Sequence, residues 1–467
     1  MTRPARLRLD SVTWTSHQLV MRFSLDALLF STVYWYPDTD LISLERRFGH
    51  DLLERLFVHT ALFEINKIVS LRPQTLDLGA YARYHTEALE SLWSTVIQHV
   101  WAQWRYENNL PAEQPPRWVS QPCAAGMSPA ARDRDAGEVL LFCGGGKDSL
   151  VAMKLLERSE IPYASFAYAS SVYGSAGSQF QWIDGLLDHG RPRRRHRQIV
   201  CDDFFDAPVL ELVGSAVGVH TLTAAETPSS IFASLPILLD RGYSHAVLGH
   251  EASANRGNLI WNATGEDVNH QWGKSLAAER MLDAYVRTQL VSDLGVFSVL
   301  MPIFDTVIFE LLRRDEAALL ATHSCNVRKP WCRRCAKCAY VWLGYRAHLS
   351  ADVVSSMFPE DLIEIRENQG FFHDMVGLGE HTPFECIGQI EESRLALALC
   401  QARGLLGPMG QALLERLPPL ALESTLARFV RVASADACIP DSFASRILPQ
   451  MEAAAQDCRH RVTALLR

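Results

Sequence analysis

The fold is decided by residues 141–149, which read Leu141-Phe142-Cys143-Gly144-Gly145-Gly146-Lys147-Asp148-Ser149. Val139–Cys143 is a short apolar run, as buried strands are, and Leu150–Glu157 has helical spacing. The three glycines between them allow a tight turn that brings backbone N–H groups close to a phosphate. The start of the following helix adds partial positive charge. The stretch therefore predicts a strand, a phosphate-binding loop and a helix.

Three side chains extend this predicted loop. Lys147 and Ser149 supply further donors to a phosphate, and Asp148 is suited to hold Mg2+. The spacing fits neither the Walker pattern nor a dinucleotide-binding fingerprint. A plain glycine turn is the alternative, but strand, glycines, Lys, Asp-Ser and helix all agree on a nucleotide site.

Apolar strand-like runs alternate with helical segments in the same part of the chain. Further strands are predicted at Tyr163–Ala169, Arg197–Cys201, His245–Leu248 and Phe297–Ile303. This alternation predicts an α/β fold with a central doubly wound parallel sheet and helices on both faces. Sites in such sheets lie beyond the carboxyl ends of the strands.

The sequence divides into three predicted domains: 1–125, 126–345 and 346–467. The first is an N-terminal α+β domain with a hairpin, Leu7–Trp14 and Leu19–Leu25, and helices near Asp51 and over Tyr81–Trp104. A Pro-rich linker covers 107–137. The second holds the nucleotide loop. The third is helical, with helices at Glu391–Arg403 and Gly410–Leu417.

Composition narrows the function classes. The 467 residues carry 45 Lys plus Arg and 53 Asp plus Glu, a net charge of −8, which argues against a general nucleic-acid binder. No apolar stretch is long enough to span a bilayer, and the first residues lack the apolar run of a signal peptide. We therefore expect a cytoplasmic protein with a small-molecule substrate and neither a membrane nor a nucleic-acid partner. Its oligomeric state is not predicted.

Two polar segments follow predicted strands. The first, after His245–Leu248, has Gly249 and His250 as nucleotide-side residues, Glu251 as a catalytic candidate, and Asn255, Arg256 and Asn258 for substrate. The second carries Asn269 for substrate, with His270 and Lys274 as catalytic candidates. Its plainer interpretation, compatible with the first, is a helix start with Ser275 as N-cap and Glu279 in the first turn.

Four of the eleven cysteines are clustered: Cys325, Cys332, Cys335 and Cys338. Their spacing is typical of a tetrahedral thiolate site for a structural zinc ion. Nearby Lys and Arg residues offset the charge of four thiolates. An iron–sulfur cluster is the main alternative, and four unliganded thiols are the other.

The Gly-Gly-Gly-Lys-Asp-Ser run resembles the pyrophosphate loop of the ATP pyrophosphatase superfamily, usually Ser-Gly-Gly-x-Asp-Ser. Gly144 stands where that superfamily has Ser, so one hydroxyl donor is missing while the backbone cradle is kept. The resemblance implies an adenine nucleotide alpha hydrolase-like fold, cleavage of ATP between its α and β phosphates, and Mg2+.

A wider set of features resembles the UDP-MurNAc-L-Ala-L-Glu epimerases. It comprises Ala61–Ile65, the phosphate loop, His-Glu-Ala-Ser-Ala-Asn at 250–255, Asn-His-Gln-x-x-Lys-Ser at 269–275, the cysteines, and His381–Cys386. That family inverts the terminal glutamate of a peptidoglycan precursor and converts ATP to AMP and pyrophosphate. The resemblance implies adenylation of the glutamate carboxylate before proton transfer.

Several assignments stay open at this stage. Proton transfer needs two groups on opposite faces or one mobile base, with Glu251, His270 and Lys274 as candidates and Cys386 and His381 as less favoured ones. A tRNA thiolase and a 7-cyano-7-deazaguanine synthase are the competing functions. The basic run 191–197 is suited to attract the uridine diphosphate of a nucleotide substrate or RNA, and a solvated loop before a strand is the simpler interpretation.

Overall fold

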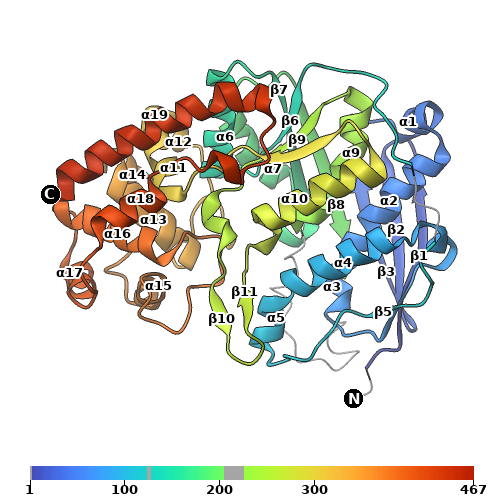
Figure 1. The fold of residues 1–467 in the computed structure, drawn as a ribbon, viewed down its shortest axis with the longest axis horizontal. Helices are drawn as coiled ribbons and strands as arrows, with labels where there is room; N and C mark the ends of the chain where they lie inside the picture. Colours follow the sequence, from blue (N-terminus) through green and yellow to red (C-terminus); the bar gives the residue numbers. More distant parts are fainter. Residues whose placement is uncertain (1–2, 124–127, 205–225, 467) are drawn as a thin grey trace.

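A single ten-stranded sheet runs through the molecule (Figure 1). The computed structural model describes residues 3–123, 128–204 and 226–466, so part of the predicted linker, 124–127, lies outside the described residues. The sheet order is β12-β9-β6-β7-β8-β3-β2-β1-β4-β5. The strands are β1 Arg6–Trp14, β2 Gln18–Leu25, β3 Leu28–Trp35, β4 Thr75–Asp77, β5 Arg117–Trp118, β6 Val139–Phe142, β7 Tyr163–Ser170, β8 Arg195–Asp202, β9 His245–Leu248 and β12 Gly295–Ser298.

Five of these strands, β12-β9-β6-β7-β8, are mutually parallel. Their order means that the chain winds one way from β6 through β7 to β8, and then returns to β9 and β12 on the other side of β6. The winding direction therefore reverses between β6 and β9. This confirms the predicted α/β class, and it places a topological switch point beside the predicted phosphate loop.

The predicted strand Phe297–Ile303 is wrong in extent. β12 covers Gly295–Ser298, and the chain then turns, with Met301 N–H bonded to Ser298 O and Ile303 N–H bonded to Leu300 O. These residues are apolar because they are buried in the core. A short apolar run does not distinguish a buried strand from a buried turn.

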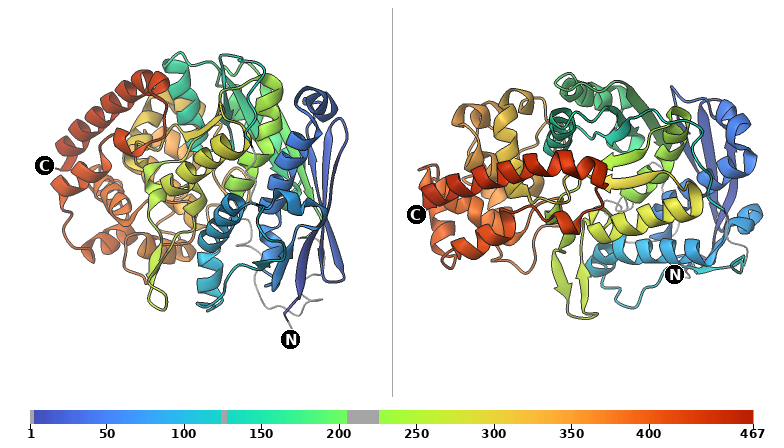
Figure 2. Two further views of the ribbon diagram at one scale, coloured as in Figure 1. Left: turned by 45° about the vertical axis from the view of Figure 1, so that its right-hand side comes forward. Right: turned by 45° about the horizontal axis from the view of Figure 1, so that its top comes forward.

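The predicted hairpin is confirmed as β1 and β2, but it is part of a larger structure. β3 continues it as a three-stranded meander and pairs antiparallel with β8. The strands of the predicted N-terminal domain thus extend the central sheet (Figure 2). The three-domain division itself stays a prediction.

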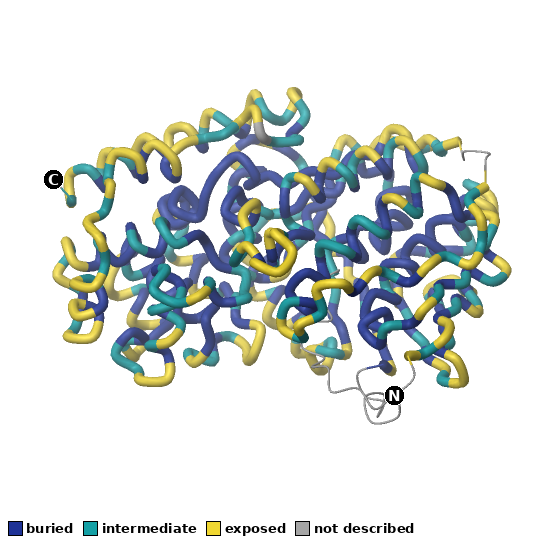
Figure 3. The backbone as a smooth tube through the Cα atoms, turned by 60° about the horizontal axis from the view of Figure 1, so that its bottom comes forward, coloured by how far each residue is buried: buried dark blue, intermediate teal, exposed yellow. Residues whose placement is uncertain are grey.

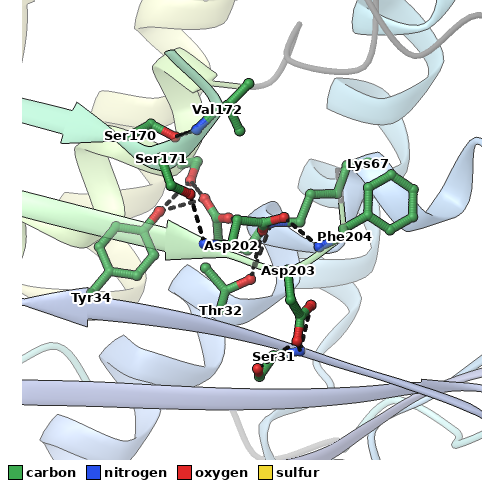
Figure 4. A network of polar contacts seen from close by, with 12 residues as sticks. Ser31, Thr32, Tyr34, Lys67, Ser170, Ser171, Val172, Asp202, Asp203 and Phe204 are labelled. Atoms are coloured by element: carbon green, nitrogen blue, oxygen red, sulfur yellow. Dashed lines mark hydrogen bonds and ion pairs between the residues drawn. The ribbon is translucent and has the colours of Figure 1, made fainter. Parts of the chain in front are cut away.

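Figure 4 shows the polar contacts at this junction between β3 and β8. Asp202, at the end of β8, accepts hydrogen bonds from Thr32 Oγ1 at 3.0 Å and from Lys67 Nζ. Asp203 accepts from the Ser31 N–H at 2.9 Å and from the Ser31 hydroxyl at 2.7 Å. Because the Lys67–Asp202 pair is buried, removing either partner would leave an uncompensated charge at the junction.

Helices cover both faces of the sheet. On the N-terminal side lie α1 Leu41–Phe48, α2 His50–Glu64, α3 Asn66–Val69, α4 Glu87–Val100 and α5 Ala102–Glu107. The central part contains α6 Lys147–Arg158, α7 Ala176–Leu187, α9 Glu226–Arg241, α10 Leu276–Tyr285, α11 Asp305–Leu312 and α12 Glu316–Leu319. The C-terminal part contains α13 Ala336–His348, α14 Ala351–Met357, α15 Gln369–Met375, α16 Ile390–Ala402, α17 Pro408–Glu415, α18 Leu422–Phe429 and α19 Asp441–Leu466. A small hairpin, β10 Leu259–Trp261 and β11 Glu266–Val268, stands apart from the main sheet.

The predicted helical segment Tyr81–Trp104 is interrupted. A 3-10 helix, η1, covers Gly79–Tyr84, and α4 begins anew because the Thr86 hydroxyl accepts a hydrogen bond from the Leu89 N–H at 3.1 Å. A Thr N-cap satisfies one of the free N–H groups at a helix start. The predicted C-terminal helices are confirmed as α16 and α17.

Two large hydrophobic cores lie on opposite faces of the sheet. Leu141 and Val247 belong to one, while their strand neighbours Leu140 and Ala246 belong to the other. This alternation is the period of two that a strand imposes. The C-terminal helices share the first core with α6, and the N-terminal helices share the second with α9, so buried segments run through both halves (Figure 3).

In the described part of the chain, every helix is too short or too polar to cross a membrane.

Candidate active site

The phosphate loop leaves β6 at Cys143 and enters α6 at Lys147, as predicted from the sequence. Gly145 has φ +84°, in the left-handed region that favours glycine. A Cβ on Gly144 would meet no atom within 4 Å, so this face of the loop is open. The Gly144 N–H donates to Ser149 Oγ at 3.1 Å, which ties the loop to the first turn of the helix. The loop therefore presents backbone N–H groups and a helix N-terminus to whatever lies in front of it.

A cavity of about 600 Å³ lies in front of this loop. It opens at the carboxyl ends of β6, β7 and β9, where the winding direction of the sheet reverses. Its volume is typical of a small-molecule site. Its wall includes two glycines, Gly144 and Gly249. The polar side chains of the wall are those of Asp148, Ser149, Glu226, His250, Lys274, His323, Arg328 and Lys329, among others. Much of the predicted nucleotide set thus surrounds one cavity.

His323 also belongs to this wall. The His323 ring packs against Gly145 so closely that a Cβ on this glycine would lie 2.2 Å from Nε2 of the ring. The backbone N–H of His323 also donates to the Gly145 carbonyl at 2.9 Å. Neither ring nitrogen makes a well-formed hydrogen bond within the described protein. Burial lowers the pKa of His323 to about 4, so the ring is neutral at neutral pH. A buried imidazole beside the glycine loop is suited to contact a phosphate oxygen.

Lys147 points away from the cavity. Its Nζ lies 2.5 Å from Asp148 Oδ1 and also contacts Asp305, and the residue is 1% exposed. Although burial opposes it, the carboxylates of Asp148, Asp305 and Glu251 raise the pKa of Lys147 well above its usual range. The lysine therefore compensates the charge of a carboxylate cluster below the loop.

Those carboxylates suit a divalent cation. Burial, followed by the charges of Asp148 and Asp305, raises the pKa of Glu251 above its usual range. Asp148 reaches into the cavity wall, while Glu251 is buried behind it. Mg2+ prefers one or two carboxylates together with phosphate oxygens, and Asp148 beside the loop fits that preference.

His270 and Lys274 come together around Cys386. Lys274 Nζ lies 2.9 Å from Cys386 Sγ, His270 hydrogen-bonds the thiol, and Lys337 donates to the Cys386 carbonyl. Burial opposes ionisation, but Lys274, His270 and Lys337 together hold the pKa of the Cys386 thiol well below its usual range. We call Cys386, Lys274, His270 and Lys337 the thiolate pocket.

His250 and Glu226 are the other titratable groups near Lys274. Burial, with a smaller effect of Lys274, lowers the pKa of His250 to about 3, so it is neutral. Burial raises the pKa of Glu226 to about 7, although a hydrogen bond from Tyr173 opposes the shift. The cavity wall thus holds a carboxyl group that is partly protonated near neutral pH.

The predicted substrate-binding asparagines use their amides inside the protein. Asn255 Oδ1 accepts from the Leu276 N–H at 2.7 Å, and Asn269 Nδ2 donates to Ala254 O at 2.9 Å. Asn258 Oδ1 accepts from the His270 N–H at 3.0 Å, while its Nδ2 donates to Pro383 O at 2.8 Å. These three residues therefore join the loops that carry His270, Lys274 and Cys386.

Arg256 lies on the other side of these loops. Its side chain is 56% exposed, and it lines a second cavity of about 370 Å³ together with Asn258 and Glu391. Its Nη1 lies 3.7 Å from a Glu391 carboxylate oxygen. The second cavity adjoins the loop 382–391, which also carries Cys386.

The four clustered cysteines converge as predicted. Their sulfur atoms all lie within 4.8 Å of one another, with 3.9 Å between Cys325 and Cys335 and 3.8 Å between Cys332 and Cys338. A tetrahedral zinc with Zn–S bonds of about 2.3 Å separates its sulfurs by roughly 3.8 Å. Backbone N–H groups of Arg328, Arg334 and Cys338 point at three of the sulfurs at 3.4 Å. The site therefore fits a closed, four-thiolate zinc centre.

This cluster adjoins the cavity in front of the phosphate loop. Cys325, Arg328 and Lys329 all line the cavity, and Ser324 Oγ accepts from the Lys147 N–H at 3.4 Å. A metal held by Cys325 would therefore fix the segment that carries His323 against the phosphate loop.

Two further sequence features have structural partners. The His381 ring stacks on Phe384, with centroids 4.6 Å apart, and the neighbours of the Cys386 thiol are instead Lys274 and His270. In the basic run, Arg193, Arg195 and Arg197 pair with Glu138, Asp188 and Asp184. The solvent interpretation of that run is the one that these ion pairs favour.

Five residues of the site carry no recognisable sequence signal of their own: His323, Glu226, Asp305, Lys337 and Glu392. Asp305 and Glu392 lie behind the phosphate loop, where Asp305 contacts Lys147 and Glu392 accepts from Ser253 Oγ at 2.8 Å. For His323, the one available hint was its position two residues before Cys325, the first clustered cysteine. The Ser275 N-cap is confirmed, since its hydroxyl accepts from the Ala278 N–H.

Comparison with known proteins identifies two matched segments. Residues 225–299 match the family model described as MurL N-terminal domain, and residues 320–411 match the MurL C-terminal domain. A Micromonospora protein named UDP-N-acetyl-alpha-D-muramoyl-L-alanyl-L-glutamate epimerase is 28% identical over 77% of this chain and 79% of its own length. A protein of the same name from Xanthomonas oryzae pv. oryzae is 27% identical over 67% of each chain. No solved structure matches.

Proposed function

Because the chain belongs to the MurL family of UDP-N-acetyl-alpha-D-muramoyl-L-alanyl-L-glutamate epimerases, we propose that it inverts the terminal L-glutamate of UDP-MurNAc-L-Ala-L-Glu. In this proposal ATP is cleaved to AMP and pyrophosphate, and the product is the D-Glu epimer, a peptidoglycan precursor. The observation that carries the proposal is the 600 Å³ cavity, which joins a phosphate loop to a set of proton-transfer groups.

The chemistry explains why an epimerase would use ATP. The α-proton beside a carboxylate is very weakly acidic, because its removal adds a second negative charge to the same group. Adenylation of the carboxylate removes the first charge and makes the acyl group electron-withdrawing. A protein base is then able to take the proton, and return of a proton to the opposite face followed by hydrolysis gives the D-centre.

The residues around the loop support binding of ATP. Gly144, Gly145 and Gly146 with the start of α6 are suited to the phosphates, and His323 is suited to a further phosphate oxygen. The strand order around β6 and the loop sequence support a fold of the ATP pyrophosphatase type. Mg2+ held by Asp148 would neutralise phosphate charge during adenylation.

Different parts of the site support different steps. Lys147 and Glu251 belong to the carboxylate cluster below the phosphate loop, which suits them to adenylation. His270 and Lys274 flank Cys386, which suits them to proton transfer. The second cavity near Arg256 is suited to a further part of a large nucleotide-sugar substrate.

The test uses the whole protein with UDP-MurNAc-L-Ala-L-Glu, ATP and Mg2+ in D2O. We expect release of AMP and pyrophosphate, and a D-Glu product that carries deuterium at its α carbon. Free glutamate should react poorly, because binding energy from the rest of the substrate positions the carboxylate. Release of ADP and orthophosphate would contradict the proposal. So would pyrophosphate release triggered by a tRNA or a deazaguanine carboxylate instead of the dipeptidyl nucleotide.

A further inference from the structure

The side chain of Lys274 is paired differently from those of Lys67 and Lys147, two buried lysines of this site and its surroundings. Lys67 contacts Asp202, and Lys147 contacts Asp148 and Asp305, so each is compensated by carboxylates. Lys274 instead donates to Cys386 Sγ at 2.9 Å. A neutral thiol does not compensate a buried ammonium group, whereas a thiolate does. The geometry therefore favours the ionised form of Cys386.

The other polar contacts of Cys386 act in the same direction. His270 hydrogen-bonds the thiol, and Lys337 donates to the carbonyl of the same residue. His270 is itself held in place, since its Nδ1 contacts Gln103 Oε1 at 2.6 Å and its N–H bonds to Asn258. Lys274 and His270, from the segment 269–275, thus contact the Cys386 sulfur, while Lys337 from α13 holds the carbonyl of the same residue.

Two buried cysteines elsewhere in the chain show how burial changes the pKa of a thiol that has only a packing role. Cys400 and Cys458 are fully buried, and burial raises the pKa of each to about 12. Cys386 is only partly buried, and its pKa is shifted the opposite way. Strong shifts caused by specific charged partners at a cavity are typical of functional groups.

The position of the thiol relates it to the reacting carbon. Its partner Lys274 lies in the cavity wall, which it shares with Asp148 and the phosphate loop. An acyl group activated at the phosphate loop would place its α carbon next to the activated carbonyl. The base that takes the α-proton must therefore lie at the edge of the same cavity, where Lys274 and Cys386 meet.

We propose that the Cys386 thiolate is the base that removes the α-proton of the activated glutamyl residue, with Lys274 and His270 as the positioning residues that keep it ionised. This inference rests on the proposed function. In the step, the Cα–H bond breaks and an S–H bond forms. The electron pair of the Cα–H bond passes into the acyl group as an enolate, and no oxidant or reductant is involved.

Inversion also requires an acid that returns a proton to the opposite face of the α carbon. Glu226 belongs to the same cavity wall, and its pKa of about 7 leaves part of it protonated near neutral pH. Its carboxyl group and the Cys386 thiol act on each other electrostatically. A thiolate and a protonated carboxyl group in one cavity are the complementary pair that inversion requires.

Five titratable groups face the thiol and set its ionisation. Lys274, His270 and Lys337 favour the thiolate, while Glu385 and Glu226 oppose it. Removing the Lys274 charge should therefore move the titration of Cys386 to higher pH. Lys274→Arg keeps the charge and should restore most of the shift.

The first experiment separates the base from adenylation. Cys386→Ala, with ATP, Mg2+ and UDP-MurNAc-L-Ala-L-Glu in D2O, should release pyrophosphate within about threefold of wild type. Its α-deuterium incorporation should fall by roughly 10²–10⁴-fold, the usual effect of removing a general base. Cys438→Ala is the matched control, because Cys438 is also partly buried and burial together with Glu279 raises its pKa to about 11.

Two outcomes would overturn the proposal. Deuterium incorporation that persists in Cys386→Ala means that another group takes the proton. Loss of both pyrophosphate release and incorporation, in a variant that unfolds at the wild-type temperature, means that Cys386 serves binding or adenylation.

A second experiment measures the pH at which the Cys386 thiol ionises, and it does not require enzymatic turnover. Alkylation of Cys386 by iodoacetamide, followed by peptide mass spectrometry, should be half-maximal well below pH 8 in wild type and above it in Lys274→Met. Cys438 in the same sample should react slowly over this range. An unchanged Cys386 profile in Lys274→Met would overturn the positioning role. If the wild type releases no pyrophosphate with the dipeptidyl nucleotide, the proposed function fails while this profile still reports the thiolate.

Discussion

Two sites in this molecule are suited to hold sulfur in its ionised form, and their contacts differ. In the four-cysteine cluster, the sulfurs face one another 3.8–3.9 Å apart and receive backbone N–H groups, a closed arrangement that suits a metal ion. In the thiolate pocket, one sulfur faces Lys274 and His270 at the edge of a cavity. A metal shared by four thiolates leaves no ligand position free. A thiolate that is stabilised by the side chains of Lys274 and His270, with no metal bound, remains free to take a proton. The difference teaches that the partner of a thiolate, rather than the thiolate itself, decides between a structural and a chemical role.

The largest expected effect separates these two sites. Cys335→Ser, or prolonged treatment with a zinc chelator, should give poorly soluble, unfolded protein, because binding of a structural zinc contributes directly to folding. Cys386→Ser should fold normally and keep about one zinc per chain. Metal analysis and circular dichroism of the two variants check this. Wild-type protein purified with iron and sulfide, or folded without any metal, would contradict the zinc assignment.

A second prediction concerns Lys147, the buried cation that is paired with carboxylates where Lys274 is paired with sulfur. Lys147→Met should lower the free energy of unfolding by about 3–5 kcal/mol, because it leaves the buried charge of Asp305 uncompensated and removes the cation beside the partly exposed Asp148. Lys154→Met on the same helix removes a more exposed lysine paired with Glu157, and should cost about 1 kcal/mol or less. Urea unfolding curves measure both. Equal losses in the two variants would show that the carboxylate cluster does not depend on Lys147.

A third prediction concerns the pH dependence of stability. The pKa of Cys386 is lower in the folded protein than the value of about 8.5 expected for an unfolded chain. Between these two values the unfolded state binds the extra proton, so the contribution of the thiolate rises with pH. It is complete above about pH 8.5 and is lost as pH falls toward the folded pKa.

The stability difference between wild type and Cys386→Ala should therefore be larger at pH 9 than at pH 5. Chemical unfolding at intermediate pH values would trace the change, and Cys438→Ala, measured in parallel, should not show this dependence. A difference that grows as pH falls would mean that Cys386 is a neutral thiol.

The smallest expected effect tests the link between the four-cysteine cluster and the phosphate loop, which His323 makes by its contacts with Gly145. His323→Ala should raise the KM for ATP by about 2–12-fold, the loss of one hydrogen bond worth about 0.5–1.5 kcal/mol, while zinc content stays unchanged. His373→Ala on α15, far along the chain and one-third exposed, serves as the control. An unchanged KM would mean that His323 supports the loop only by packing.

The sequence alone determined the phosphate loop and the cysteine cluster. In both, the chemistry is carried by residues within a short stretch: Gly144–Ser149 in one case and Cys325–Cys338 in the other. The local backbone conformation then determines the relative positions of these residues. The strands β6, β7 and β9 were predictable for the same reason, since burial on both faces leaves a continuous, mostly apolar run.

Only the tertiary structure decided which residues surround Cys386. Lys274 and Cys386 are 112 residues apart, and Asn258 and His270 connect to the Cys386 loop through side-chain hydrogen bonds. The sequence also did not predict that the N-terminal meander continues into the central sheet. This continuation depends on the pairing of β3 with β8, whose nearest ends are 160 positions apart in the chain, and the sequence pattern does not show which distant strands pair. Likewise, the sequence predicts that Lys147 is a phosphate ligand. In the structure its Nζ contacts Asp305, which lies at the start of α11, far downstream in the chain. Sequence pattern records the local requirements of an element, whereas the charge around a buried group is set by whichever distant segments pack against it.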